Sequence, residues 1–259
     1  SYPRIVGETG GKDFIVAHPD CKEKALLTAM LRGAFEFQGQ KCSAASRCYI
    51  PASVWERIKQ PYIEEVSKVK MGDPADFTNL VSAVIDEKAF NNITGYIERA
   101  RESEDAEIIT GGNYDSSVGW FIEPTTIVVK DPQYESMKEE IFGPVLTVYV
   151  YDDERFEDVL KLCDETSPYS LTGSIFANQE ADIETATKAL RYSSGNYYIN
   201  DKPTGAVVGQ QPFGGARGSG TNDKAGSPIN LMRWVSVRTV KRNFNPPEDW
   251  RYGFLKPDE

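Results

Sequence analysis

Apolar residues recur at a helical period along much of this chain. Six of them share one face of a stretch that follows the polar pair Asp20 and Glu23: Ala25, Leu26, Ala29, Met30, Ala34 and Phe37. The spacing of Asp20 and Glu23 is that of a capping box, which satisfies free N–H groups at the start of a helix. The pattern therefore predicts a helix that ends near Gly39. Further helices are predicted over residues 52–69, 88–101, 156–163 and 182–191.

Short runs rich in β-branched and aromatic residues separate these helices. The predicted strands cover residues 5–6, 14–16, 47–50, 108–109, 122, 125–129, 145–151, 171–176 and 196–200, and residues 235–240 alternate as an edge strand does. Strands that alternate with helices are typical of an α/β fold, so we expect an open, mostly parallel sheet with helices on both faces. Residues 202–226 are rich in glycine and are expected to form loops, and residues 245–259 have the composition of a tail.

Composition narrows the kinds of partner. The chain has 259 residues, 40% of them hydrophobic, which is enough for one large or two small domains with a core. Its formal net charge is −10 and no patch is rich in Lys or Arg, which argues against nucleic acid or an anionic membrane surface. No apolar run reaches the ~18 residues that a membrane-spanning helix needs. Neither a nucleic-acid partner nor a membrane is therefore expected.

The cysteines and the single histidine limit the chemistry. The four cysteines lack the spacing of zinc ligands or of a CxxC pair, so free thiols in a reducing compartment are expected. His18 is the only histidine and precedes a predicted helix, which disfavours a Cys–His dyad and a His-rich metal site. No metal site is expected. A nucleophilic cysteine would need a carboxylate or water as its proton partner.

Cys42 and Glu8 are the candidate catalytic pair. Cys42 lies in the run GQKCSAASR, and the four residues after it are small, so no bulk shields the thiol. Glu8 lies 34 residues upstream in GETGGK, where glycines let the backbone approach a ligand closely. A nucleophile and a base are the minimum for covalent acyl chemistry. Taken singly, a cysteine is more often a small buried hydrophobe, and a glutamate beside glycines is usually a turn residue.

The glycine-rich run GGARGSG, at residues 214–220, has two interpretations. It does not match the GxGxxG fingerprint of a dinucleotide-binding loop, and no convincing buried strand precedes it. A turn that lines a pocket fits better than a loop that binds a pyrophosphate.

Six motifs occur together in one order: GETGGK, GQKCSAASR, EEIFGPVL, YSLTGSIF, GNYYIND and PFGGARGSG. In this order and spacing they resemble the aldehyde dehydrogenase superfamily over essentially the whole chain. Within it, the runs YINDKPTGAVVGQQPFGG and GTNDKAG are most similar to the mitochondrial-type Δ1-pyrroline-5-carboxylate dehydrogenases. These enzymes oxidise L-glutamate γ-semialdehyde to glutamate in proline catabolism.

The resemblance implies roles in catalysis and cofactor binding. Cys42 would attack the aldehyde carbon, and Glu8 would activate the water that hydrolyses the resulting thioester. The implied cofactor is NAD, whose nicotinamide amide would meet the backbone carbonyl of Thr9. Glu140 would hold the nicotinamide ribose hydroxyls, and Phe142 would pack beside that ribose.

The resemblance also implies a site for the substrate. Gly205 and Ala206 would bind its α-carboxylate through backbone N–H groups, with help from Ser43, and backbone amides in such a loop hold an anion well. Phe213 would wall the aliphatic part. A dehydrogenase for another aldehyde stays an alternative, although enzymes for apolar aldehydes have no α-carboxylate to hold. The other alternative is a non-catalytic truncated homologue that binds a partner, such as a parent dehydrogenase subunit.

The same resemblance divides the chain. Residues 1–10 would be a remnant of the cofactor-binding domain, 11–222 the catalytic domain, and 223–259 a C-terminal segment with an edge or oligomerisation strand and a tail. The Rossmann half of the family would be absent, so we expect this chain alone to bind NAD weakly and to be inactive. We expect a homo-oligomer, or association through the exposed former domain interface. The implied location is the mitochondrial matrix in a eukaryote and the cytoplasm otherwise.

Overall fold

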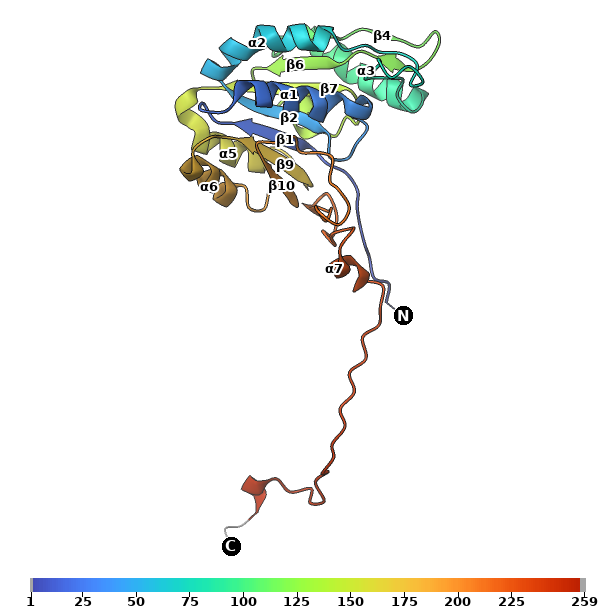
Figure 1. The fold of residues 1–259 in the computed structure, drawn as a ribbon, viewed down its shortest axis with the longest axis vertical. Helices are drawn as coiled ribbons and strands as arrows, with labels where there is room; N and C mark the ends of the chain where they lie inside the picture. The colour runs from blue at the N-terminus through green and yellow to red at the C-terminus, as the bar shows by residue number, and fades with distance from the viewer. Residues whose placement is uncertain (1, 257–259) are drawn as a thin grey trace.

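A seven-stranded sheet forms the centre of the molecule (Figure 1). The computed structural model describes residues 2–256, in which the sheet has the order β10-β9-β1-β2-β7-β6-β3. Its strands are β1 (Asp13–Ala17), β2 (Ala45–Pro51), β3 (Ala106–Thr110), β6 (Thr125–Val129), β7 (Val145–Tyr151), β9 (Thr172–Phe176) and β10 (Asn196–Ile199). Neighbouring strands run parallel except for β3, which is antiparallel to β6. The predicted open, mostly parallel sheet is confirmed.

Helices cover both faces of this sheet (Figure 1). One face carries α1 (Glu23–Phe35) and α2 (Ala52–Ser67), and the other carries α3 (Glu87–Glu102), α5 (Phe156–Glu165) and α6 (Glu180–Ala189). Successive side chains of a strand point to opposite faces. Ile15 of β1 therefore packs with the first two helices, while Phe14 and Val16 pack with the other three. The result is one apolar core on each face.

Shorter elements complete the fold. Two small antiparallel pairs join β8 (Tyr169–Ser170) to β11 (Ala216–Arg217) and β4 (Tyr114–Asp115) to β5 (Phe121–Ile122). The short helices are α4 (Glu135–Lys138), α7 (Pro228–Leu231), η1 (Glu36–Gly39), η2 (Asp153–Arg155) and η3 (Gly253–Leu255). None of the helices described over residues 2–256 has the length and apolar character required to cross a bilayer.

The predicted capping box at the start of α1 is wrong. Lys22 occupies the cap position and its side chain makes no capping hydrogen bond. The carboxylate of Asp20 instead accepts hydrogen bonds from the backbone N–H groups of Asn178, at 3.1 Å, and Gln179, at 3.0 Å. Asp20 thus joins the segment before α1 to the start of α6, a pairing across the fold that spacing along the chain does not show.

Two predicted strands are also absent from the described residues. Residues 5–6 form no strand, and the chain there runs toward the isolated bridge between Glu8 and Gly220. Residues 235–240, expected as an edge or oligomerisation strand, are likewise not a strand. A strand needs a neighbour for its backbone N–H and C=O groups, and among the described residues no segment pairs with 235–240 as a strand, although the Arg4 side chain donates to the Val235 carbonyl.

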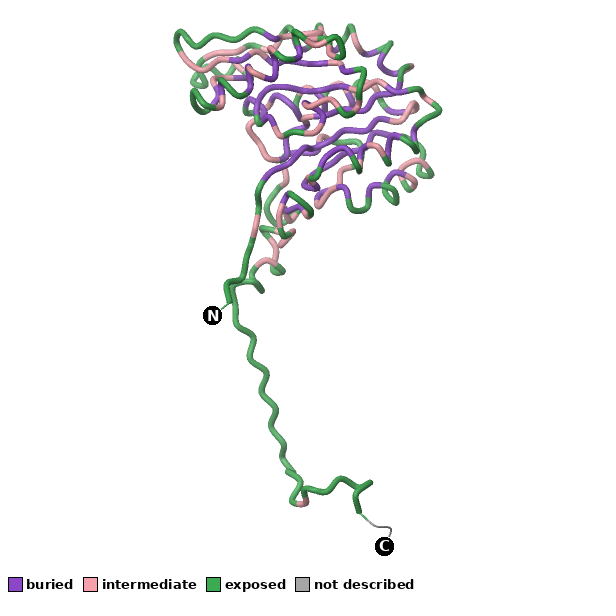
Figure 2. The backbone as a smooth tube through the Cα atoms, turned by 180° about the vertical axis from the view of Figure 1, so that it is seen from behind, coloured by how far each residue is buried: buried purple, intermediate pink, exposed green. Residues whose placement is uncertain are grey.

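The C-terminal segment extends away from the rest of the molecule (Figures 1 and 2). Buried positions concentrate in the sheet and its helices, whereas the segment after α7 is almost entirely exposed (Figure 2). It carries large apolar side chains on its surface: Ile229, Leu231, Met232, Trp234, Val237, Val240 and Phe244. An extended arm with this much exposed apolar surface has the character of an interaction segment.

Candidate active site

The candidate site lies where the parallel strands begin. The predicted site segments come directly before strands: residues 8–12 precede β1, residues 40–44 precede β2, and residues 140–143 precede β7. Parallel strands begin at the same edge of a sheet, so these segments meet there. Ligands of open α/β sheets more often bind at the carboxyl ends of the strands. The opposite edge is used here because the loop after α1 and the loop before β7 converge on it.

A sharp reversal after α1 positions Cys42. Phe37, Gln38 and Gly39 are consecutive left-handed residues, with φ of 56°, 57° and 64°. A Cβ at Gly39 would lie 2.2 Å from the carbonyl oxygen of Gly143, so glycine permits the close approach of the loop before β7. The Gln38 side chain secures the reversal by donating to the carbonyl of Ala83 at 3.1 Å. Cys42 follows in the next turn with its side chain half-buried.

The segment with Glu8 is held by the second glycine-rich run. The N–H of Gly7 donates to the Thr221 hydroxyl at 2.9 Å, and the N–H of Thr9 donates to the Ser219 carbonyl at 3.2 Å. The run GGARGSG therefore acts as a turn that supports the site and pairs through β11 with β8. Glu8 and Thr9 are both exposed. Glu8 thus lacks the desolvation that a general base needs.

Gly10 and Gly11 let Glu140 and Cys42 approach the same turn. The N–H of Gly11 donates to Glu140 Oε1 at 3.0 Å. A Cβ at Gly10 would lie 2.4 Å from Glu140 Oε2, and a Cβ at Gly11 would lie 2.2 Å from the carbonyl oxygen of Cys42. Burial raises the pKa of Glu140 even though Gly11 and Lys12 favour its charged form. The turn thereby fixes the carboxylate close to the nucleophile loop.

An open cleft of about 560 Å³ collects six of the nine predicted residues: Cys42, Ser43, Phe142, Gly205, Ala206 and Phe213. The Ser43 hydroxyl lies 2.8 Å from that of Thr204, which also lines the cleft. Gly205 has φ of 92°, a conformation that favours glycine. Glu8, Thr9 and Glu140 do not line this cleft, although Glu140 borders a smaller hollow with Phe142. A further hollow, of about 430 Å³ beside α1 and α2, contains none of the predicted site residues.

The electrostatics around Cys42 oppose its ionisation. Burial and the negative charges of Asp13, Glu8 and Glu140 raise the pKa of the Cys42 thiol to about 11. A thiol with that pKa is almost wholly protonated at neutral pH, so within this chain Cys42 is not poised as a thiolate. Cys21 and Cys163 are buried more deeply and their pKa values are raised to about 12. Cys42 remains the most accessible and most acidic of the three.

A buried group of charged residues beneath this loop was not predicted. Lys12, Asp13 and Arg47 are each about 2% exposed. The Arg47 guanidinium donates to the Lys12 carbonyl at 2.9 Å, while Asp13 accepts the Thr172 N–H at 2.7 Å. In the sequence Lys12 and Asp13 stand between a glycine pair and a strand, and no alternation there shows that both side chains point inward.

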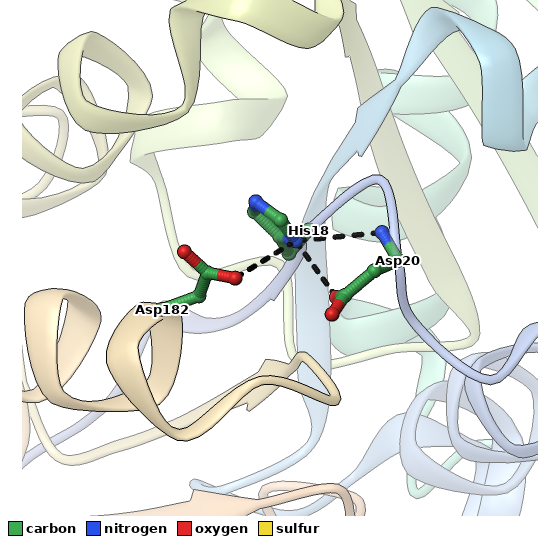
Figure 3. Close-up of side chains that lie close together, drawn as sticks. All are labelled: His18, Asp20 and Asp182. Carbon is green, nitrogen blue, oxygen red and sulfur yellow. Dashed lines mark hydrogen bonds and ion pairs between the residues drawn. The ribbon is translucent and has the colours of Figure 1, made fainter.

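His18 lies at the other end of β1, away from Cys42. It follows the strand whose first residue is Asp13, and five steps of about 3.3 Å separate the two by about 16 Å. There it contacts Asp20 at 2.7 Å and Asp182 at 3.7 Å (Figure 3). These three residues are the candidate metal-ligating group found within residues 2–256. Because Asp20 already accepts two backbone N–H groups, the cluster serves as a link between the loop after β1 and α6.

Comparison with known proteins identifies the family. A model of the aldehyde dehydrogenase family matches residues 1–240. The chain belongs to the aldehyde dehydrogenase family. Over 254 residues it is 62% identical to the mitochondrial Delta-1-pyrroline-5-carboxylate dehydrogenase of Dictyostelium discoideum, covering 98% of this chain and 46% of that protein. The corresponding Mus musculus protein is 51% identical over 257 residues, which cover 99% of this chain and 46% of the mouse chain.

A solved structure supports the same relationship. The crystal structure of the Delta-pyrroline-5-carboxylate dehydrogenase from Mycobacterium tuberculosis bound with NAD superposes with a TM-score of 0.90 at 49% identity. The match covers 99% of this aldehyde dehydrogenase chain and 46% of the bacterial one. The chain therefore spans about half the length of the relatives it matches.

The residues around Glu140 fit a ribose. Glu140 Oε1 accepts the N–H of Gly11, and Oε2 lies where a side chain at Gly10 would otherwise be, so one carboxylate oxygen is left for hydroxyl donors. Phe142 has φ of 57° and its side chain is 44% exposed beside the cleft. A carboxylate acceptor beside an exposed aromatic ring is a chemically suitable pair for a sugar. The described residues thus fit the nicotinamide-ribose end of a dinucleotide.

Proposed function

We propose that this chain is the catalytic part of an NAD-dependent dehydrogenase that oxidises L-glutamate γ-semialdehyde to glutamate through a thioester on Cys42. The observation that carries the proposal is the convergence of Cys42 and the Gly205–Ala206 loop on one cleft. A nucleophile at one place in the cleft and backbone amides at another match a substrate with an aldehyde at one end and a carboxylate near the other. The relatives' names support this substrate class.

The loop from Thr204 to Phe213 forms the substrate end of the cleft. The Phe213 N–H donates to the Ala225 carbonyl at 2.9 Å, and the Ala225 N–H donates back to Phe213 at 2.7 Å. This reciprocal pair anchors the loop, in which Gly205 adopts a conformation that favours glycine. Backbone amides in such turns bind anions. Ser43 and Thr204, paired at 2.8 Å, add hydroxyl groups to the same region.

Catalysis would begin with the thiol. Cys42 gives its proton to water or a carboxylate, and its sulfur adds to the aldehyde carbon, so a C–S bond forms as the carbonyl π electrons move to oxygen. Bound NAD supplies the acceptor for the hydride that leaves the same carbon. The thioester that results remains on Cys42. Since the surrounding carboxylates hold the thiol protonated, deprotonation of Cys42 requires a positive charge or hydrogen-bond donors beyond those that the described residues provide.

Glu8 would complete the reaction. It would take a proton from water, the hydroxide oxygen would attack the thioester carbon, and the C–S bond would break to regenerate the thiol and release the acid. The negative charge of Glu8 contributes to the raised pKa of the Cys42 thiol, which supports a role for Glu8 near it. Glu8 is exposed in this structure, so a surface that covered it and excluded water would make it a stronger base.

The wider assignments follow from the relatives and the exposed surfaces. The chain would work in the mitochondrial matrix of a eukaryote, since the eukaryotic relatives named above are mitochondrial, or in the cytoplasm of a prokaryote. Its exposed arm would join it to another subunit, as a homo-oligomer or through a domain interface. By itself the chain would sustain little turnover, because the residues that fit the cofactor, Glu140 and Phe142, suit only its nicotinamide ribose.

An activated ester tests the nucleophile and the base on this chain without any cofactor. With p-nitrophenyl acetate, Cys42 should take the acetyl group in a burst of nitrophenolate, followed by slow hydrolysis. Cys42→Ala should abolish the burst. Glu8→Gln should leave the burst intact and slow the steady phase; an equal fall in both phases would mean that Glu8 positions the thiol instead.

The substrate itself is tested in the native polypeptide that carries this sequence. Oxidation of glutamate γ-semialdehyde with NAD should exceed that of an aldehyde of equal length without the α-carboxylate. If the two are oxidised equally well, the assigned role of the Gly205–Ala206 loop is wrong.

A further inference from the structure

Asp13 stands directly behind the nucleophile. Its Oδ2 lies 2.5 Å from the position that a Cβ at Gly11 would take, and the Cys42 carbonyl oxygen lies 2.2 Å from the same position. The two groups therefore meet across a residue with no side chain. Asp13 Oδ1 accepts the Thr172 N–H at 2.7 Å, and the Thr172 hydroxyl reaches the Ser43 carbonyl at 3.5 Å. The carboxyl group is thus linked to the Cys42 loop indirectly, across Gly11 on one side and through Thr172 on the other.

The charges around Asp13 come from three directions. Lys12 directly precedes Asp13 in the chain, Arg47 lies on β2, and Glu140 lies in the loop before β7. The Lys12 ammonium is fully buried and has no hydrogen-bond partner among the described residues. Burying an ammonium group without a hydrogen-bond partner is unfavourable, and a nearby negative charge offsets part of that cost. Burial and Arg47 lower the pKa of Lys12 to about 7, although Asp13 and Glu140 favour its charged form.

Burial decides the state of Asp13 in this chain. Burial raises the pKa of Asp13 to about 8, although Arg47 and the Thr172 hydrogen bond favour its charged form. Asp13 is the largest of the charges that oppose ionisation of Cys42, ahead of Glu8 and Glu140. The carboxyl therefore changes charge within the range in which enzymes work, while it stays in place beside the nucleophile.

We propose that Asp13 is a positioning residue for the nucleophile: it holds the Cys42 loop through Thr172 and Gly11, and its charge controls how readily the Cys42 thiol reacts. The inference rests on the proposed function in taking Cys42 as the nucleophile. It goes further by assigning a control of reactivity to a buried residue that touches neither substrate nor cofactor.

The sign of the effect follows from the geometry. While Asp13 is protonated, the thiol ionises without its opposition, and the rate of alkylation rises with pH as the thiolate fraction grows. Once Asp13 ionises, its negative charge holds back further thiolate formation. The logarithm of the alkylation rate should therefore bend toward a shallower slope near pH 8 in the wild-type chain. In a variant without the Asp13 charge, the logarithm of the alkylation rate should rise with one slope across this pH range.

The test is the pH profile of iodoacetamide labelling of Cys42 between pH 6 and 10, read on the Cys42 peptide by mass spectrometry. Asp13→Asn keeps the acceptor for the Thr172 N–H and removes the charge. It should label at the wild-type rate near pH 6.5 and faster above pH 8. The rate should rise about threefold for each unit by which the thiol pKa falls. The gain is smaller than tenfold because a thiolate of lower pKa is also a weaker nucleophile.

Controls separate charge from structure. Asp182→Asn removes a carboxylate at the far end of β1 and should leave the profile unchanged (Figure 3). If Asp13→Asn does not fold, Glu140→Gln removes a carboxylate that raises the pKa of Asp13 and should move the bend to lower pH. General loosening would instead raise labelling of Cys21, Cys48 and Cys163 at every pH. A wild-type profile without a bend, or a bend that persists in Asp13→Asn, overturns the proposal. Neither result depends on dehydrogenase activity, so both are distinct from failure of the proposed function.

Discussion

Replacing Gly11 by alanine should displace the nucleophile. The added Cβ would lie 2.2 Å from the Cys42 carbonyl oxygen and 2.5 Å from Asp13 Oδ2, whereas ordinary contacts begin at 3.4 Å. Both groups must move, and the Cys42 carbonyl oxygen, the closer of the two, must move by more than an ångström. Asp13 is held by the Thr172 N–H, and Gly11 itself is held by Glu140, so the larger displacement falls on the Cys42 loop.

The expected cost has two parts. Overpacking of a tight site destabilises a protein by about 1–3 kcal/mol. In a chain of this size each kcal/mol lowers Tm by about 2–4 °C. A misplacement of about 1 Å at a reacting group can cost about 100-fold in rate, so the burst with p-nitrophenyl acetate should slow by a similar factor. Reactivity should therefore suffer far more than stability.

Gly7→Ala is the matched control in the same segment. The nearest side-chain atom to its Cβ would be on Thr221 at 3.6 Å, an ordinary contact. This substitution should change the free energy of unfolding by no more than about 0.5 kcal/mol and leave the burst rate intact. Thermal unfolding and stopped-flow absorbance measure the two quantities. Equal effects of the two substitutions, or a normal burst in Gly11→Ala, would refute the steric argument.

Two further predictions concern the wild-type chain. Iodoacetamide should modify Cys42 before Cys21, Cys48 or Cys163, and the rate should keep rising up to about pH 11, because burial and nearby carboxylates raise the thiol pKa to that value; an early plateau near pH 8 would show a poised thiolate instead. Calorimetry should detect weak or no NAD binding by this chain, and light scattering should show self-association, since Ile229, Leu231 and Trp234 are exposed. Micromolar NAD affinity in a clean monomer would contradict both parts.

Hydrophobic period predicted the fold well because the same residues decide both burial and local structure. The strands 125–129 and 145–151 were predicted at the bounds the structure gives to β6 and β7. Each is rich in β-branched and apolar residues and is mostly buried, as is typical of a strand with helices on both faces. The helix predicted over residues 52–69 likewise begins where α2 begins and extends two residues beyond its end. Strand order and the antiparallel edge pair could not be predicted, since they depend on which segments meet in space.

The errors share a physical cause. Residues 235–240 alternate as a strand does, but alternation gives a segment only a suitable side-chain pattern and not a neighbour for its backbone. Asp20 and Glu23 have the spacing of a cap, but Asp20 binds backbone N–H groups at the start of a different helix. In both cases the deciding partner lies far away in the sequence.

The candidate site shows the same division between residue type and environment. Motifs predicted which residues gather, and six of nine line one cleft. They did not predict that the thiol would be surrounded by negative charge. That property depends on Glu8, Glu140 and Asp13, and the fold buries Asp13 behind the glycine turn that precedes it in the sequence. A nucleophile predicted from its motif can therefore lie in surroundings that oppose its ionisation, and those surroundings become visible only when the fold brings Asp13 behind the Cys42 loop.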